Sequence, residues 1–297
     1  MYARAMTDTI RIATDRLSAE LSTFGAELRV LRDEQGRDLL SDGPPEYWTG
    51  RAPFLFPVVG ATNGDVIHVD GKAYPMAKHG FARKSEFALV EALPDRATFR
   101  LEASDASRAQ YPFEFRLDIT HRIEGTALRT EALLANPGAV PLPASFGFHP
   151  ALRWPLPWGG ARADHRLIFE KDEPAPIRRI EPVPGLVLPD PRPSPVQGDM
   201  LAPRDELFVE DAIIFDRLES RSVRFGVPGE RMIRVEFREM PLLGVWTKPG
   251  APFLCIEPWQ GLADPVGYAG DFRDKPHVIQ IAPGQEGRFM MTIDIGG

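Results

Sequence analysis

Hydrophobic and polar residues alternate with a period of two along much of the chain. The alternation is clear in four runs, at residues 97–101, 113–119, 233–237 and 289–295. This period places one face of a strand against a core and the other face toward water, as in antiparallel sheets. The pattern therefore predicts an all-β protein.

Turn-forming sequences separate these runs, for example Asn136-Pro137-Gly138 and Pro283-Gly284. Asp70-Gly71 lies between two short β-prone segments and predicts a tight hairpin. The best helical pattern, residues 205–215, is short, and 30 prolines oppose long helices. Many short strands with frequent turns indicate a sandwich or a barrel, and the pattern alone does not choose between them.

A proline-rich segment interrupts the strand pattern. Nine prolines fall between Lys171 and Pro203. An interdomain linker is one interpretation, but the strand patterns on both sides are alike. We therefore expect a single domain over residues 1–297, with residues 171–203 as a long excursion beside a binding cleft.

Composition excludes several classes of partner. The 297 residues are 43% hydrophobic and 26% charged, with a net charge of −7 and no basic run. Nucleic acid and membrane are therefore not expected as partners. No secretory signal and no membrane-spanning run of about 18 apolar residues is present, so we expect a cytoplasmic protein. The sequence does not indicate an oligomeric state.

Three short stretches place titratable side chains where an apolar strand meets a turn. They are residues 78–83 (KHGFAR), 146–150 (FGFHP) and 255–261 (CIEPWQG). Strand ends of this kind often line a cleft. Taken singly, a histidine at such a strand end is more often structural than catalytic, and a glutamate before Pro-Trp is more often a surface or turn residue.

Together and in this order, the stretches resemble the aldose 1-epimerase family of the galactose mutarotase-like superfamily, in its LacX-like bacterial branch. The resemblance runs through most of the chain. It is carried by residues 24–28 (FGAEL), 52–60 (APFLFPVVG), 79–83 (HGFAR), 147–150 (GFHP), 210–215 (EDAIIF), 244–249 (GVWTKP) and 256–264 (IEPWQGLAD).

The resemblance implies a large antiparallel β-sandwich and a mutarotase that interconverts the α and β anomers of an aldose. In such a reaction a base removes the O1 proton while an acid protonates the ring oxygen, and general acid–base help is typically worth about 10²–10⁴-fold. The family roles imply Glu257 as the base and His149 as the acid. The reaction needs no metal, redox cofactor or nucleophile, so no cofactor is expected.

The resemblance also implies a set of sugar-binding residues. His79 matches a family histidine that binds and polarises the sugar, and Asp211 matches an aspartate that binds its hydroxyls. Trp259 is either a sugar-facing ring or core packing. At reference pKa values of about 4.3 and 6.5, Glu257 would be ionised at neutral pH and His149 partly protonated.

One departure from the family pattern concerns the residue after Gly60. Many members carry a sugar-contacting arginine there, whereas this chain has Ala61. Asn63, Arg83 or Arg51 are candidates to fill the space. The departure leaves the sugar unspecified and disfavours a sugar phosphate, which would suit arginine's forked donors. Two alternatives stay open: a sugar-binding relative without turnover, and an epimerase that acts on a sugar phosphate.

The remaining titratable groups are expected to be structural. His121 falls on the apolar phase of its strand and is expected in the core. We expect His68, His165 and His277 at the surface or in loops, and Cys255 as a small buried hydrophobe. The spacing of His79, His149 and Glu257 matches no compact metal motif, so no metal site is expected.

Overall fold

The computed structural model describes residues 9–296. Within this range nearly all regular structure is β-strand, and every pairing between named strands is antiparallel. The one α-helix of the described chain, α1 (Asp105–Arg108), has four residues. The prediction of an all-β fold is confirmed. No helix within residues 9–296 has both the length and the apolar character needed to cross a membrane.

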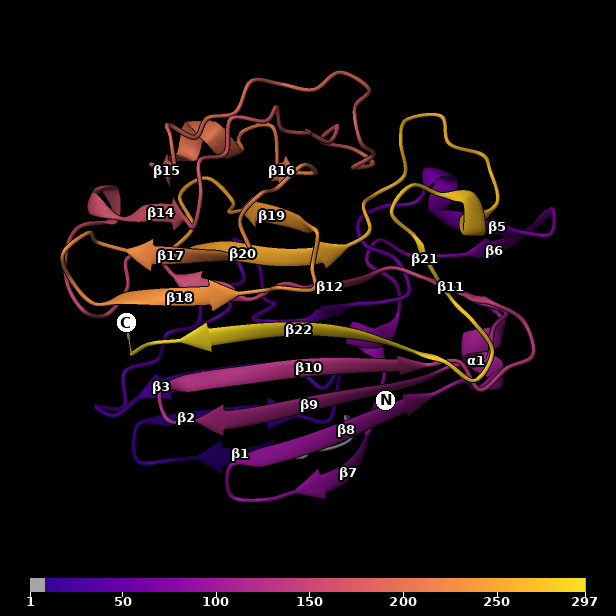
Figure 1. Cartoon of the computed structure of the whole chain (residues 1–297), viewed down its shortest axis with the longest axis horizontal. Coiled ribbons are helices and arrows are strands. Elements are labelled where there is room, and N and C mark those ends of the chain that lie inside the picture. The colour runs from indigo at the N-terminus through magenta and orange to yellow at the C-terminus, as the bar shows by residue number, and fades with distance from the viewer. Residues whose placement is uncertain (1–8, 297) are drawn as a thin grey trace.

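The largest sheet has nine strands and crosses the middle of Figure 1. In spatial order they are β15 (Met200–Leu201), β14 (Arg166–Phe169), β17 (Ser222–Gly226), β18 (Met232–Glu236), β22 (Glu286–Asp294), β10 (Ala127–Ala135), β9 (Arg116–Glu124), β8 (Arg96–Glu102) and β7 (Ala88–Ala92). The C-terminal strand β22 joins the two halves, because it pairs with β10 on one side and β18 on the other. The four alternating runs of the sequence supply β8, β9, β18 and β22.

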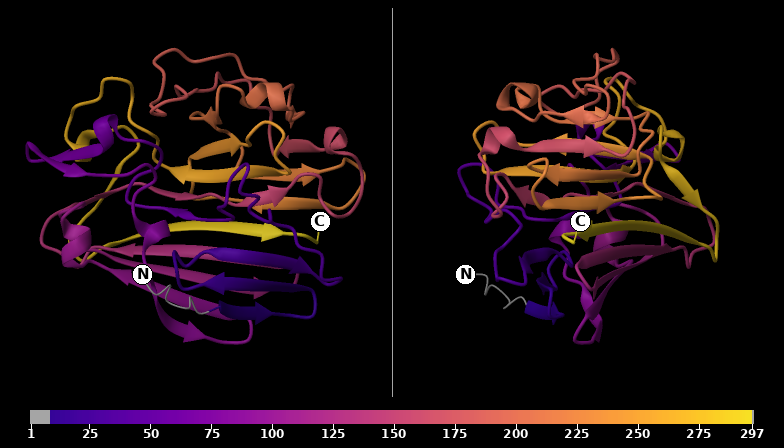
Figure 2. Two further views of the ribbon diagram at one scale, coloured as in Figure 1. Left: turned by 180° about the vertical axis from the view of Figure 1, so that it is seen from behind. Right: turned by 60° about the vertical axis from the view of Figure 1, so that its left-hand side comes forward.

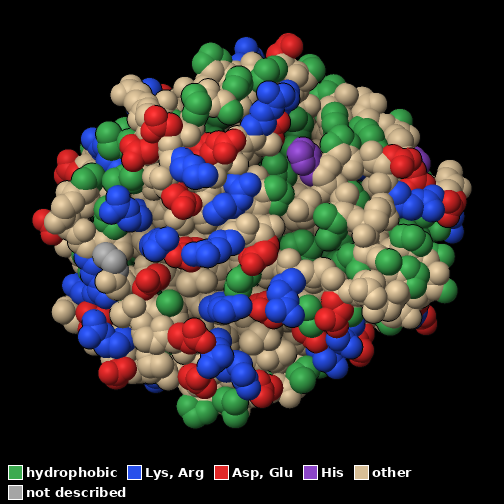
Figure 3. Space-filling model, in the orientation of Figure 1, with side chains coloured by type: hydrophobic (Ala, Val, Ile, Leu, Met, Phe, Trp, Pro, Cys, Tyr) green, Lys and Arg blue, Asp and Glu red, His purple; other side chains and the backbone are tan. Residues whose placement is uncertain are grey.

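Strand β10 shows how the alternation builds this sheet. Leu128, Ala132 and Leu134 point inward and are fully buried, whereas Arg129 and Glu131 lie on the outer face and form an ion pair at 3.4 Å. Figure 3 shows acidic and basic side chains interleaved over this face. Fully burying each leucine is worth about 1.5–3 kcal/mol, so the inward face stabilises the sheet.

Smaller sheets pack against the large one. A six-stranded sheet contains β16 (Ile213–Phe215), β19 (Leu242–Trp246), β20 (Phe253–Gln260), β12 (Phe146–Phe148) and β4 (Phe54–Leu55), with β13 (Ala151–Arg153) also on β20. A three-stranded sheet contains β1 (Thr9–Ala13), β2 (Leu17–Ser22) and β3 (Leu28–Asp33), and Figure 2 shows it lying against the lower part of the large sheet. The Phe146 ring of the six-stranded sheet stacks on the Phe289 ring of the large sheet, with centroids 4.9 Å apart. The layers therefore share one core, as in a sandwich.

Short elements complete the described chain. They are the hairpin β5 (Val66–Val69) and β6 (Lys72–Pro75), the pair β11 (Leu142–Ala144) and β21 (Ile279–Ile281), and the 3₁₀ turns η1 (Asn63–Asp65), η2 (Ala82–Lys84), η3 (Arg162–Asp164), η4 (Asp205–Phe208) and η5 (Phe272–Asp274). Asp70 and Gly71 connect β5 to β6 with φ values of 51° and 74°. Two central residues with positive φ are what a tight hairpin turn requires, and this hairpin was predicted.

The helical pattern at residues 205–215 does not form a helix of that length. It gives η4, a turn, and then β16, whose three residues are all buried. Asp211 has a φ of 63°, a left-handed conformation that a right-handed helix cannot contain. Pairing of Ile213–Phe215 with β19 then outweighs the helical pattern.

The proline-rich segment lies across the top of Figure 1, over the six-stranded sheet. Isolated bridges tie Arg178 to Ile214 and Val187 to Pro265, and the side chains of Ile177 and Leu186 are buried. The segment therefore contributes to the wall of the molecule beside β16. That the whole chain is one domain stays a prediction.

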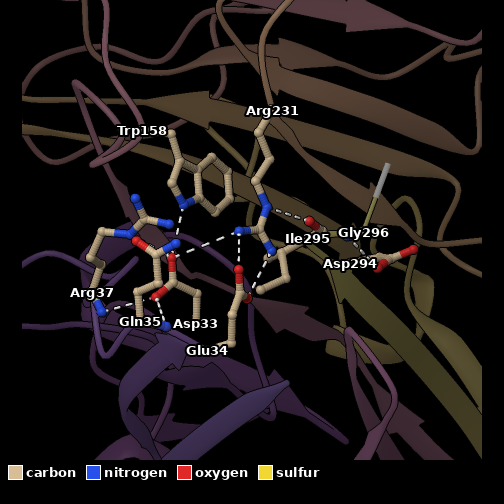
Figure 4. A network of polar contacts seen from close by, with 9 residues as sticks. All are labelled: Asp33, Glu34, Gln35, Arg37, Trp158, Arg231, Asp294, Ile295 and Gly296. Atoms are coloured by element: carbon tan, nitrogen blue, oxygen red, sulfur yellow. Dashed lines mark hydrogen bonds and ion pairs between the residues drawn. The ribbon is translucent and has the colours of Figure 1, made fainter. Parts of the chain in front are cut away.

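A polar network joins the three-stranded sheet to the large sheet (Figure 4). The buried carboxylate of Asp33 accepts hydrogen bonds from Trp158 Nε1 at 2.9 Å and Arg37 Nε at 2.8 Å. Arg231 stacks on the Trp158 ring, pairs with Glu34 at 2.9 Å, and donates to the Ile295 carbonyl at 2.8 Å. The network orients the two sheets on each other.

Candidate active site

Strand β20 lies inside the six-stranded sheet, with β19 on one side and β12 and β13 on the other. Because successive side chains of a strand point to opposite faces, Cys255, Glu257 and Trp259 share one face. All three are buried. The same alternation sends Ile256 into the main core. The strand therefore holds the Glu257 carboxylate rigidly on the face opposite that core.

The ring of Trp259 lies across its neighbouring strands, where glycines make room for it. A Cβ atom at Gly147 on β12 would lie 2.7 Å from the Trp259 ring, and one at Gly244 on β19 would lie 2.5 Å from it. Neither contact is sterically allowed, so both positions require glycine. Trp259 is both packed against the sheet and part of the lining of the cleft described below, so the two interpretations of this residue are compatible.

His149 follows β12 and faces Glu257. Its Nε2 atom lies 3.2 Å from Oε2 of Glu257. The imidazole packs against the Trp48 ring, tilted by 33° with centroids 4.6 Å apart, and the rings of Trp246 and His79 each lie edge-on to it at 5.8 Å. These aromatic contacts fix the plane of the imidazole beside the carboxylate.

His79 is held by the loop that contains Gly60. Its backbone has a φ of 67°, and its Nδ1 atom accepts a hydrogen bond from the Gly60 backbone N–H at 3.1 Å. In return, the His79 N–H donates to the Gly60 carbonyl at 2.8 Å. Since Nδ1 accepts, the neutral ring carries its proton on Nε2. His79 therefore offers the cleft a hydrogen-bond donor.

Asp211 enters the cleft from the turn between η4 and β16. Arg179 anchors this turn, because its guanidinium donates to the carbonyls of Asp211 at 3.0 Å and Leu207 at 2.8 Å. One carboxylate oxygen of Asp211 accepts from the Ala212 backbone N–H at 2.7 Å. The arrangement holds the left-handed backbone of Asp211 in place and leaves carboxylate lone pairs for a ligand.

These elements enclose one cleft of about 330 Å³. It is at the small end of the usual range for small-molecule sites, about 300–1,000 Å³. All six residues expected at the site from the sequence line it: His79, Arg83, His149, Asp211, Glu257 and Trp259. Lys78, Tyr47, Trp48, Trp246, Ile180 and Gly185 also line it and were not expected.

Several buried polar atoms in the cleft have no hydrogen-bond partner among residues 9–296. They are Nδ1 of His149, Nε of Arg83, Nε1 of Trp259 and Oε2 of Glu257, whose 3.2 Å approach to Nε2 of His149 lacks hydrogen-bond geometry. Buried polar groups in folded proteins are nearly always paired, so such a cluster needs an explanation. Hydroxyl groups of a ligand can act as both donors and acceptors and would satisfy it.

Burial changes the protonation of the catalytic candidates. Desolvation, with a further contribution from the charge of Asp211, raises the pKa of Glu257 well above its usual value, while Lys78 acts in the opposite direction. Desolvation lowers the pKa of His149 to about 3, and it also lowers the pKa of His79 well below its usual value. The reference pKa values used with the sequence therefore do not apply. Both shifts favour the uncharged forms of the two side chains.

The structure narrows down which residue could take the place of the family arginine that is missing after Gly60. Asn63 donates its side-chain amide to the Tyr268 carbonyl at 3.0 Å, and Arg51 donates to the carbonyls of Arg29 and Asp42, so neither lines the cleft. Arg83 does line it, with a guanidinium that donates to the Lys78 carbonyl at 2.9 Å. Lys78 could have been predicted as a lining residue from the sequence, because it immediately precedes the HGFAR stretch. Trp48 could not, because its loop carries no motif.

The other histidines are divided between core and surface. His121 is buried, as expected, and contacts Thr130 Oγ1 at 3.1 Å and the Ala26 carbonyl at 3.0 Å. His277 is exposed and His68 is half-buried. His165 lies in the connection between η3 and β14, as the loop expectation allowed, but its side chain is fully buried rather than at the surface. Its Nε2 accepts from the Leu156 N–H at 2.9 Å, which explains why a polar ring is tolerated there.

His149, Cys255 and Glu257 also present potential metal ligands. Their ligand atoms lie within 4.8 Å of one another. Burial raises the pKa of the Cys255 thiol well above its usual value, which disfavours the thiolate that a metal would need. The donor set is thus a poor fit for a metal, in line with the sequence expectation, which stays a prediction.

Comparisons with known proteins agree with this geometry. The family model for aldose 1-epimerase matches residues 8–288. Protein LacX (plasmid) of Lactococcus lactis subsp. lactis is 32% identical over 284 residues, covering 93% of this chain and 95% of that protein. A galactose mutarotase-like protein from Lactobacillus casei is 26% identical with a TM-score of 0.89, covering 97% of this chain and 99% of the other. A galactose mutarotase related enzyme from Lactobacillus acidophilus has the same TM-score at 24% identity, covers 98% of each chain, and shows the fold alone. The chain belongs to the aldose 1-epimerase family.

Proposed function

We propose that this protein is a mutarotase, an isomerase that interconverts the α and β anomers of an aldose by opening and reclosing the ring. The observation that carries the proposal is the buried pair formed by Glu257 and His149, whose side chains approach to 3.2 Å in the cleft. O1 and the ring oxygen are both bonded to C1. A base and an acid that act on these two oxygens must therefore stand close together, as this pair does.

Each turnover moves two protons and consumes none. Glu257 accepts the O1 proton as the C1–O1 bond becomes a carbonyl, and His149 gives a proton to the ring oxygen as its bond to C1 breaks. Rotation about C1–C2 presents the other carbonyl face. The same groups then act in reverse, so the ring closes to the other anomer and the pair returns to its starting protonation state.

The pair holds the single proton that this cycle needs. In the buried pair the raised pKa of Glu257 and the lowered pKa of His149 favour the uncharged arrangement. Transfer of one proton over 3.2 Å produces the carboxylate and imidazolium that the assigned roles require. Sugar hydroxyls that satisfy the unpaired atoms of the site would favour this charged form, because hydrogen bonds to an ionised group stabilise it.

The remaining lining residues are proposed to hold the sugar. His79 donates from Nε2, and Asp211 accepts hydroxyl protons with its free lone pairs. The rings of Trp259 and Trp246 provide apolar surface for the C–H faces of a pyranose. Arg83 lines the same cleft and lies near His79.

Polarimetry tests the proposal. Pure α and β anomers of a panel of aldoses are dissolved immediately before use, and the approach to anomeric equilibrium is followed with the protein and with heat-inactivated protein. We expect a rate above the spontaneous rate that is proportional to protein concentration for at least one sugar. Binding of a sugar without any acceleration would instead favour a sugar-binding relative that lacks turnover.

A further inference from the structure

Lys78 is a cation in the cleft for which the acid–base mechanism has no use. Its side chain lines the cleft and is half-buried. Among residues 9–296 its ammonium group has neither an ion-pair partner nor a hydrogen-bond acceptor, whereas Lys275, the buried lysine nearby in the fold, pairs with Asp264 at 2.7 Å. An unpaired lysine inside a binding cleft is consistent with a ligand that supplies the missing anion.

The ammonium lies at the wall formed by the proline-rich segment. A Cβ atom built on Gly185 would be 3.4 Å from Nζ of Lys78, 3.8 Å from the Ala61 Cβ and 3.9 Å from Cδ1 of Ile180. Because Gly185, Ala61 and Ile180 have no polar side-chain atoms, these residues offer the ammonium no side-chain hydrogen-bond acceptor. Lys78 also acts electrostatically on Glu257 and His149, so it stands within reach of a sugar placed over them.

Arg83 is the other cation that lines the cleft among the described residues. Its guanidinium donates to the Lys78 carbonyl at 2.9 Å, and Glu27 lies near it. The Lys78 ammonium has no such acceptor among the described residues, so it is the cation that remains available to an anionic ligand.

We propose that the cleft selects an anionic aldose, one that carries a carboxylate or a phosphate group away from C1, and that Lys78 is the residue that binds this group. The inference rests on the proposed function for its reaction but concerns the charge of the substrate. A neutral sugar that binds over Lys78 would displace water from the ammonium and replace it with an uncharged hydrogen-bond acceptor. An anionic group would instead accept a hydrogen bond in which both partners are charged, and such a bond is roughly twice as strong as one between neutral groups.

Three hexoses that differ only at C6 test the inference: D-glucose, D-glucuronate and D-glucose 6-phosphate. Their anomer exchange is followed by NMR at equilibrium, with the spontaneous rate of each subtracted. We expect kcat/KM for at least one anionic sugar to exceed that for glucose by about 10- to 150-fold, the range of a hydrogen bond to a charged group. Preference for glucuronate assigns the site to a carboxylate, and preference for the phosphate assigns it to a phosphate monoester.

Variants connect the preference to one side chain. Lys78→Met should reduce the ratio of anionic to neutral kcat/KM to near one, Lys78→Arg should keep most of it, and Lys84→Met, at an exposed position of the same segment, should leave it unchanged. Thermal melts check that each variant is folded. Added NaCl should lower kcat/KM for the anionic sugar in the parent protein more than for glucose.

The inference fails if the parent protein handles the three sugars within about threefold of one another, or if Lys78→Met lowers all three rates equally. If the parent protein turns over none of them, the proposed reaction fails for these sugars, and calorimetric titration of the same three sugars decides the inference. Tighter binding of an anionic sugar that is lost in Lys78→Met supports it. Equal binding, or no binding of any of the three, overturns it.

Discussion

Nε2 of His149 lies 3.2 Å from Oε2 of Glu257, and neither side chain is open to bulk water. Glu257 lies on β20, whereas His149 directly follows β12, and the two residues are more than 100 positions apart in the sequence. Their proximity means that one proton can be exchanged within the pair. Their burial disfavours the ionised form of each side chain.

Replacement of Glu257 tests the catalytic assignment directly. Glu257→Gln keeps the size of the side chain but cannot accept the O1 proton at neutral pH. We expect kcat/KM for anomer exchange to fall by about 10²–10⁴-fold, the usual contribution of general acid–base catalysis. His149→Asn should cause a similar loss. The double variant should be little worse than either single one, because the two residues act as a unit.

The control for these variants is the fold. Far-UV circular dichroism and thermal unfolding should match the parent protein within a few degrees. A folded Glu257→Gln protein that turns over its sugar at nearly the parent rate would falsify the assignment of Glu257 as the base.

The pH dependence of kcat/KM should reflect the shifted pKa values rather than the reference ones. With reference values the active form, ionised glutamate with protonated histidine, would be largely confined to between about pH 4.3 and 6.5. Burial lowers the pKa of His149 to about 3 and raises the pKa of Glu257 well above its usual value. We therefore expect the alkaline decline in rate to follow the raised pKa of the Glu257 carboxyl, where the pair loses its proton, rather than the ordinary histidine pKa.

Rates measured from pH 4 to 9 by NMR exchange, after subtraction of the buffer rate, check this expectation. The Glu257→Gln variant should lack the alkaline decline that the Glu257 carboxyl produces. An alkaline decline centred near the ordinary histidine pKa would show that the cleft does not shift the pair as described.

Chelation separates proton transfer from metal catalysis. The ligand atoms of His149, Cys255 and Glu257 lie close enough together to bind a divalent ion, so metal catalysis has to be tested. The proposed cycle transfers protons between oxygen and the pair and needs no Lewis acid. We expect full activity after exhaustive dialysis against EDTA, and Cys255→Ala should retain turnover in folded protein. Loss of activity with EDTA that one added divalent ion restores would support metal catalysis instead.

The fold was predictable from the sequence as far as local patterns reach. Alternation in residues 97–101 and 289–295 identified β8 and β22, because burial of one strand face leaves a period of two. The strand order was not predictable. β22 inserts between β10 and β18, partners distant in the sequence, and such pairing depends on long-range contacts that no local pattern records.

The site was predicted where it is carried by motifs. His79, His149 and Glu257 line one cleft, although only their family motifs suggested that they would meet. Trp48 and Gly185 come from segments without a motif, so their place in the cleft depends on how the chain folds over it. The left-handed turn at Asp211 was missed for a related reason, because the apolar residues after it are equally compatible with a helix.

His121 should make stability depend on pH without affecting catalysis. It is fully buried, and burial lowers its pKa to about 4, although the Ala26 carbonyl partly opposes this shift. The unfolded chain binds a proton on this histidine below about pH 6.5, whereas the folded protein does so only near pH 4. Its contribution to stability is therefore fully present above pH 6.5 and is lost, at about 1.4 kcal/mol per pH unit, as the pH falls toward 4. Urea unfolding at pH 7, 6, 5 and 4 measures this loss.

His121→Leu should lower stability at pH 7 by about 1–3 kcal/mol, because the Ala26 carbonyl loses its donor, and it should flatten the decline at lower pH. The rate per folded molecule should stay near that of the parent. An unchanged pH dependence of unfolding in His121→Leu would show that another group is responsible for it.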